Sequence, residues 1–133
     1  RSKNLVETGL QELIRYLRPA QATSRYAVQD VKIGGVEIAQ NDVIVTLLGA
    51  ANHDPAKFIH PEEILIDRTP NNHLGFGSGA HHCVGATAAA DFLSSFLCFL
   101  YDYPGKFSLF ARPTYLNTAT FRCFDKLLVQ YHV

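Results

Sequence analysis

The chain has 133 residues, of which 47% are hydrophobic, and it carries 12 basic and 12 acidic side chains. These values describe an ordinary globular polypeptide of about one domain. Zero net charge without a run of like charges argues against binding to nucleic acid or to a membrane surface, and no apolar stretch is long enough to cross a bilayer. With no signal peptide at its start, we expect a cytoplasmic protein.

The first predicted element is an amphipathic helix over residues 5–17. Apolar residues recur there at spacings of three and four, and Pro19 is expected to end the helix. Glu12 and Arg15 are three residues apart, so they lie on one face of this helix and can form an ion pair.

Short β-branched runs follow between residues 25 and 48, and they predict a small antiparallel sheet. The pair Gly34-Gly35 separates the runs VKI and VEI, which indicates a two-residue hairpin because glycine supplies the positive φ that such turns require. Asp54-Pro55 has the pattern of an N-cap followed by a first-turn proline, so we expect a short helix to begin there.

The second half of the chain predicts an irregular meander, a helix and a closing β pair. Residues 59–75 carry two prolines and two asparagines with little periodicity. The apolar pattern of residues 84–103 predicts a helix that stops before Pro104-Gly105, and the runs FSLF and LLVQY predict the pair of strands. The fold class is therefore α+β, mainly helical with small antiparallel sheets.

Three cysteines, Cys83, Cys98 and Cys123, stand far apart without a CxxC pair. This spacing argues against a disulfide framework and against a four-cysteine metal site. Cys98 and Cys123 lie within apolar runs, so we expect both to be small buried hydrophobic residues.

Residues 76–85, FGSGAHHCVG, place Cys83 directly before a predicted helix. Unpaired backbone N–H groups and the positive end of the helix dipole favour a thiolate at this position. A thiolate can act as a nucleophile, as a zinc ligand or as the axial ligand of a heme iron. Gly77, Gly79 and Gly85 remove side chains on both sides of the sulfur, which suits a large flat ligand lying against the backbone.

The residues alone leave several alternatives open. A nucleophilic Cys83 could use His81 or His82 as its base. Zinc could take Cys83 with His73 and one of these two histidines, although residues 81, 82 and 83 cannot easily converge tetrahedrally on one ion. A glycine-rich turn that caps a helix around a buried thiol is the third possibility.

The ten-residue segment resembles the heme-binding loop of the cytochrome P450 superfamily, in which fixed Phe, Gly, Arg or His, Cys and Gly positions surround the axial thiolate. Those positions hold, in order, Phe76, Gly79, His81, Cys83 and Gly85. Further segments resemble this family in the same order. They are the ExxR element of the K helix at residues 12–15, the strand region at 23–38, the strand and short helix at 47–58, and the L helix at 84–103.

The resemblance implies that residues 1–133 form the C-terminal third of a soluble bacterial-type member, the heme-binding part of a single domain. It implies heme b, iron protoporphyrin IX, with Cys83 as axial ligand, and His81 and Arg25 as propionate partners. Phe76 packs near the sulfur, the glycines of the loop give clearance, and Glu12 and Arg15 have a structural role. His82 is expected to point away from the heme.

The activity implied by the resemblance is oxidation of a small organic molecule with O2, using electrons from a ferredoxin or flavin reductase partner. No catalytic residue beyond the heme ligand can be named. Two positions depart from the family pattern: Glu63 stands where a third arginine is expected after Pro61, and Ala90 replaces an arginine at the partner-facing or heme-edge surface. Arg68 is the nearest candidate to complete the ion-pair network. These departures keep open an alternative, a heme-thiolate or degenerate docking module that recruits a carrier-bound substrate without monooxygenase activity.

The chain contains no methionine and begins within a helical pattern, so we expect it to belong to a longer product. The apolar stripes of its two long helices would then face helices that are absent here. We therefore expect the isolated chain to be poorly stable and prone to associate.

Overall fold

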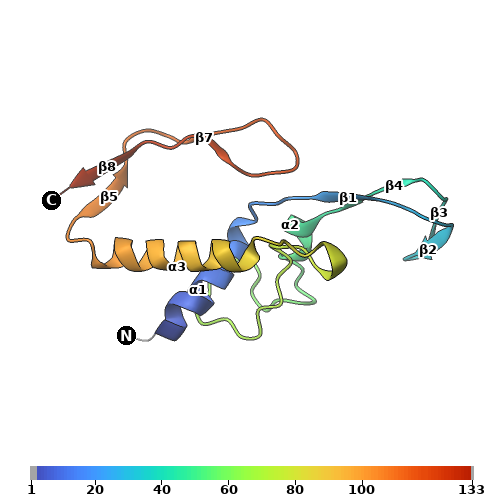
Figure 1. The fold of residues 1–133 in the computed structure, drawn as a ribbon, viewed down its shortest axis with the longest axis horizontal. Helices are drawn as coiled ribbons and strands as arrows, with labels where there is room; N and C mark the ends of the chain where they lie inside the picture. Colours follow the sequence, from blue (N-terminus) through green and yellow to red (C-terminus); the bar gives the residue numbers. More distant parts are fainter. Residues whose placement is uncertain (1–2, 133) are drawn as a thin grey trace.

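The computed structural model describes residues 3–132, in which two long helices lie between an extended β arm and a C-terminal pair of β ribbons (Figure 1). This arrangement confirms the α+β class with small antiparallel sheets. In chain order the elements are α1 Lys3–Leu17, β1 Thr23–Tyr26, β2 Val31–Ile33, β3 Val36–Ile38, β4 Val43–Thr46, α2 Leu48–Ala51, the 3-10 turn η1 Gly79–His81, α3 Ala86–Asp102, β5 Lys106–Leu109, β6 Thr114–Tyr115, β7 Phe124–Lys126 and β8 Val129–His132.

Helix α1 forms where the apolar periodicity predicts it, and it contacts α3. Its apolar residues Leu10 and Ile14 are buried, and the helix ends at Leu17. Arg18 then adopts a positive φ of 47°, and Pro19 cannot continue the helix.

The β arm consists of two separate two-stranded antiparallel sheets rather than the single sheet that the sequence suggested. Strand β1 pairs with β4, with Arg25 opposite Ile44, and β2 pairs with β3. Gly34 and Gly35 make the predicted hairpin turn, with φ values of 57° and 85°. The arm extends away from the helices, so most of its side chains are exposed (Figure 1).

The helix expected to begin at Asp54-Pro55 does not form. The short helix α2 lies earlier, and a single turn follows it: Asp54 Oδ1 accepts a hydrogen bond from the N–H of Ala56 at 2.8 Å, and the Asp54 carbonyl accepts from Lys57 and Phe58. Aspartate side chains compete in this way with helix formation by bonding to nearby backbone groups.

The remaining predicted elements are confirmed with small shifts of boundary. Residues 59–75 contain neither helix nor strand, as expected of a meander. Helix α3 begins two residues later than predicted, after the N-cap Gly85, and ends one residue early, before Pro104. The closing pair is β5 with β8, in which Lys106 lies opposite His132.

The expectation that Cys98 and Cys123 are buried is wrong. Cys98 is exposed on α3 and Cys123 is partly exposed. Apolar neighbours in sequence bury a residue only where another element covers its face, and α1 covers only one face of α3. Phe92 and Phe99 on the same helix are likewise exposed, at 71% and 54%.

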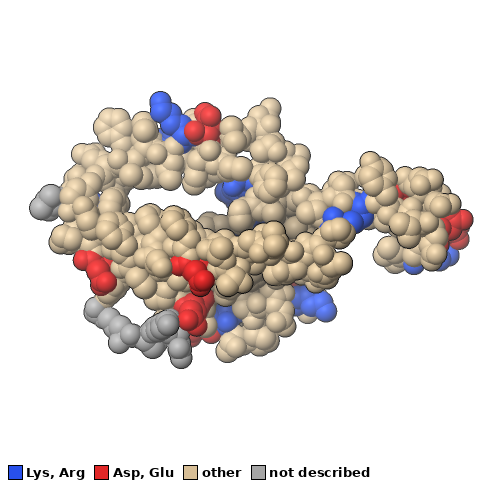
Figure 2. Space-filling model, in the orientation of Figure 1, with Lys and Arg blue, Asp and Glu red and all other residues tan. Residues whose placement is uncertain are grey.

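An apolar groove of about 400 Å³ separates α1 and α3 from the β6–β7 ribbon, and Figure 2 shows the hollow beneath the C-terminal ribbons. Its lining includes Leu13, Leu97 and Phe124. We therefore expect the isolated 133-residue chain to associate in solution, as an open apolar surface of this kind does. Sedimentation velocity checks this expectation, and a sharp thermal transition of a monomer would contradict it.

None of the helices within residues 3–132 combines the length and apolar content needed to span a bilayer.

Candidate functional site

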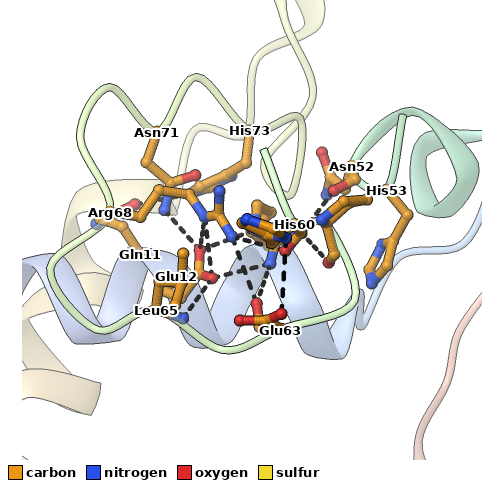
Figure 3. Close-up of polar contacts among 12 residues, drawn as sticks. Gln11, Glu12, Asn52, His53, His60, Glu63, Leu65, Arg68, Asn71 and His73 are labelled. Atoms are coloured by element: carbon orange, nitrogen blue, oxygen red, sulfur yellow. Dashed lines mark hydrogen bonds and ion pairs between the residues drawn. The ribbon is translucent and has the colours of Figure 1, made fainter. Parts of the chain in front are cut away.

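Glu12 lies at the centre of a buried ion-pair network that joins α1 to the meander (Figure 3). Its carboxylate accepts hydrogen bonds from Nε and Nη2 of Arg15, each at 2.8 Å, and from Nε of Arg68 at 3.0 Å. The N–H of Leu65 and the Nδ2 amide of Asn71 donate to the same carboxylate at 3.0 and 3.1 Å. Glu12 and Arg15 are 0% exposed, so the pair is fully removed from water.

Two guanidinium groups share this one carboxylate, and backbone carbonyls stabilise the second positive charge. The acceptors are the carbonyl oxygens of Asn52, Pro61 and Glu63 for Arg15, and those of Ile59, His60 and Glu63 for Arg68. Both guanidinium groups also lie near the buried ring of Phe58, at 5.2 and 5.9 Å from its centroid, within the range of cation–π attraction. The network therefore fixes the course of the meander.

The charge state of Glu12 follows from these contacts. Burial by itself would raise the pKa of its carboxyl group. The hydrogen bonds from Arg15, Leu65 and Arg68, with the positive charge of Arg15, outweigh burial and lower the pKa from 4.5 to about 2. Glu12 is therefore ionised in the folded protein at every pH well above 2.

Arg68 is the third member of the network, which the sequence named only as the nearest candidate. Glu63 contributes its backbone carbonyl to both arginines, while its exposed side chain turns to His60, with Nδ1 and Oε1 3.6 Å apart. The absence of an arginine at position 63 therefore does not leave the network open.

The cysteine loop, residues 76–85, joins the meander to α3. The N–H of Cys83 donates to the carbonyl of Phe76 at 2.8 Å, which closes the loop, and the N–H of His82 donates to that of Gly79 at 3.0 Å, which forms the turn η1. Gly77 and Gly79 have φ values of 73° and 69°, so both occupy the region that glycine enters without strain.

The loop leaves the Cys83 thiol open to a large ligand. Cys83 is exposed, as are the neighbouring residues 78–84. A Cβ atom built on Gly79 meets nothing within 4 Å, and one built on Gly85 lies 3.9 Å from Sγ, so a larger side chain there would cover the sulfur. An accessible thiol between glycines fits the axial ligation of a planar cofactor.

His81 and Arg25, the two expected propionate partners, lie on η1 and β1 respectively, and both side chains are exposed. Nη1 of Arg25 donates to the carbonyl of Ser24 at 2.8 Å. The ring of His82 lies 6.4 Å from the ring of Phe76, which is itself partly buried. The roles expected of these residues toward heme stay predictions.

The sequence prediction missed two residues that hold the backbone immediately before the loop. Asn52 Oδ1 accepts a hydrogen bond from the N–H of Leu74 at 2.7 Å, and His73 Nδ1 accepts one from the N–H of Gly75 at 3.0 Å. The other ring nitrogen of His73, Nε2, lies 2.8 Å from Oε1 of Gln11 on α1. These contacts connect the ion-pair network to the cysteine loop.

We expect Gly75→Ala to destabilise the protein by about 1 to 3 kcal/mol, the usual cost of overpacking. A Cβ at Gly75 would lie 2.4 Å from Cγ2 of the buried Ile14 and 3.1 Å from Nδ1 of His73. Gly9→Ala is the matched control. A Cβ at Gly9 would lie at an ordinary 3.6 Å from Ile66, and alanine is favourable at this position within helix α1. Urea unfolding measures both variants, and equal midpoints would contradict the prediction.

The zinc alternative finds no support in the geometry of the described residues. Within residues 3–132, histidine, cysteine, aspartate and glutamate side chains form no group of three or more that could hold a metal ion. His73 lies against α1, bound to Gln11, rather than beside Cys83.

A match to the family model for cytochrome P450 spans residues 4–100, from α1 through the cysteine loop to α3. The chain belongs to the cytochrome P450 family. Membership implies a heme-iron cofactor, and the open Cys83 loop fits that group.

Two curated bacterial relatives are each 45% identical to this chain. The biotin biosynthesis cytochrome P450 of Bacillus subtilis matches over 86 residues, which are 65% of this chain and 22% of the relative. The mycinamicin IV hydroxylase/epoxidase of Micromonospora griseorubida matches over 87 residues, 64% of this chain and 22% of the relative. The chain therefore spans about a fifth of the length of these relatives.

Solved structures resemble nearly the whole chain. P450BioI in complex with an acyl carrier protein ligated to hexadec-9Z-enoic acid has a TM-score of 0.88 at 36% identity, covering 98% of this chain and 34% of its own. CYP109E1 from Bacillus megaterium in complex with testosterone has a TM-score of 0.91 at 31% identity, covering 100% of this chain and 38% of its own. The fold is thus the C-terminal portion of the cytochrome P450 fold.

Proposed function

We propose that residues 1–133 form the heme-binding, C-terminal part of a single cytochrome P450 domain, with Cys83 as the axial thiolate ligand of heme b. The observation that carries this proposal is the exposed Cys83 thiol in its glycine-rich loop. Hydrogen bonds connect the residues just before this loop to the buried ion-pair network. When bound, heme supplies the iron at which O2 is activated, and a thiolate ligand favours cleavage of the O–O bond.

The chain's own residues bind and orient the cofactor. His81 and Arg25 would hold the heme propionates through charge-assisted hydrogen bonds. With heme bound, Phe76 would limit the access of water to the sulfur. Its carbonyl accepts a hydrogen bond from the N–H of Cys83, so the loop keeps its shape. Glu12 and Arg15 form a buried ion pair that supports the meander leading into the loop.

The complete protein is proposed to be a cytoplasmic monooxygenase that oxidises a small organic molecule with O2. A ferredoxin or a flavin reductase supplies its electrons. Relatives named as hydroxylases support this class of reaction, including the 6-deoxyerythronolide B hydroxylase of Saccharopolyspora erythraea, which is 37% identical over 89 residues, 67% of this chain and 22% of the relative.

The absorption spectrum tests this proposal. The longest natural polypeptide containing this chain is supplied with heme, reduced and exposed to carbon monoxide. A strongly red-shifted Soret band is the expected result, because thiolate ligation produces it. No bound heme, or the band of a histidine-ligated iron, would contradict the proposal.

A second candidate is a docking module that recruits a carrier-bound substrate without oxidising it. It is favoured by the similarity to P450BioI, whose solved structure contains an acylated carrier protein. Ala90, which departs from the family pattern, lines a hollow between α1 and α3. Binding of an acylated carrier protein by a protein that gives no red-shifted band would favour this candidate.

A further inference from the structure

A short series of hydrogen bonds runs from the side chains of Asn52 and His73 to Cys83. Their acceptor atoms fix the N–H groups of the consecutive residues Leu74 and Gly75. The carbonyl of Leu74 then accepts from the N–H of Gly77 at 2.9 Å, and the carbonyl of the intervening Phe76 accepts from the N–H of Cys83 at 2.8 Å. The position of Cys83 therefore depends on the backbone that His73 and Asn52 hold.

The two partners of His73 determine its protonation state. The N–H of Gly75 can only donate, so Nδ1 must carry a lone pair. Oε1 of Gln11 can only accept, so Nε2 must carry the proton. The structure thus requires a neutral imidazole, because a protonated ring would place an Nδ1–H against the N–H of Gly75.

The surroundings of His73 favour this neutral form. Partial burial lowers the pKa of its imidazole below 6.5. Among the charged groups that face it, Glu12 raises the pKa and Arg15 lowers it, both from α1, and the net direction is downward. The centroid of the Phe76 ring lies 6.3 Å from that of the His73 ring, and this neighbour adds no charge.

We propose that His73 is a positioning residue for Cys83. His73 holds the cysteine loop in place only while its imidazole is neutral, so acid releases the loop. The inference rests on the proposed heme-binding function. His73 does not contact the Cys83 thiol itself. It affects the position of Cys83 through the backbone of Gly75 and Phe76.

The direction of the pH dependence follows from proton linkage. In the unfolded chain His73 binds a proton at about pH 6.5, whereas the folded loop binds it only at lower pH. The stabilising contribution is therefore complete above about pH 6.5 and is lost as the pH falls below that value. Loop order and thiolate ligation should decline over the same interval.

The test compares His73→Asn, His73→Leu and the wild type in the longest natural polypeptide loaded with heme. Asparagine offers an uncharged acceptor near the position of Nδ1, whereas leucine offers none. The red-shifted band of the reduced, carbon monoxide-bound protein reports the thiolate-ligated fraction. In the wild type we expect this fraction to decrease when the pH is lowered below about 6.5. We expect His73→Asn to flatten this dependence, and His73→Leu to favour the released loop about fivefold at neutral pH, as the loss of one hydrogen bond implies.

Hydrogen exchange of the Gly75 amide in the protein without heme gives a second readout. We expect exchange at Gly75 to be faster in His73→Leu than in His73→Asn. His60→Asn is the matched control, because the exposed His60 side chain lies in the same meander and asparagine tolerates its positive φ of 49°.

The outcomes separate this inference from the proposed function. A wild type without the red-shifted band contradicts the proposed function, and the inference then fails with it. A wild type with that band, but with unchanged pH dependence and Gly75 exchange in His73→Leu, overturns the role of His73 alone. Equal flattening of the pH profile by His60→Asn would also overturn it.

Discussion

We expect Glu12→Gln to lower the free energy of unfolding by about 3 to 5 kcal/mol, the cost of removing one partner from a buried ion pair. The substitution leaves Arg15 and Arg68 buried without their shared negative charge. It also replaces one acceptor oxygen with an amide that donates, so two N–H groups would face each other at 2.8 to 3.0 Å. Glu7→Gln is the matched control, because Glu7 is exposed on the same helix.

The dependence of stability on acid pH is a second, independent test of the role of Glu12. The pKa of Glu12 is lowered from 4.5 to about 2, so its ionised form stabilises the folded protein fully above pH 4.5. That contribution, about 3 kcal/mol, is lost as the pH falls from 4.5 toward 2. Urea unfolding at several pH values should therefore show a steeper acid dependence in the wild type than in Glu12→Gln. Equal destabilisation by Glu7→Gln, or an unchanged acid slope, would contradict the role of the network.

Local patterns were sufficient to predict the two helices, the Gly34-Gly35 hairpin and the terminal β pair. Periodicity and turn residues decide such elements over a few neighbouring positions. The pairing of Glu12 with Arg15 followed for the same reason, because a spacing of three places both on one helical face. Cys83 was named from its glycines and its position before a helix, and the structure places it on an open loop.

Contacts across long stretches of chain could not be derived in this way. Arg68 lies 56 positions from Glu12, in a segment without periodicity, and only the fold brings the two together. Glu63 contributes a backbone carbonyl, which no side-chain pattern reveals. His73 was considered only as a zinc ligand, although its place three residues before Phe76 was a signal that it could support the loop. The burial expected of Cys98 was wrong because it depended on a covering element rather than on neighbouring residues.

We expect Cys83→Ala to abolish thiolate ligation completely while leaving the fold intact. The Cys83 side chain is exposed, and the hydrogen bond that closes the loop comes from its backbone N–H, which alanine retains. Heme should then bind weakly or through a histidine, and the red-shifted band of the reduced, carbon monoxide-bound protein should disappear. The absorption spectrum and the heme content of the purified protein measure both effects.

Cys98→Ala is the matched control for this substitution, because Cys98 is also an exposed free cysteine and alanine is favourable within α3. It should leave the band unchanged. Retention of the band in Cys83→Ala would remove Cys83 as the ligand, and loss of the band in Cys98→Ala would show that α3 affects ligation through a contact other than the loop. If only Cys83→Ala loses the band and its unfolding midpoint is unchanged, global unfolding is excluded as the cause. The ligand is then the thiol of Cys83, which lies between Gly79 and Gly85.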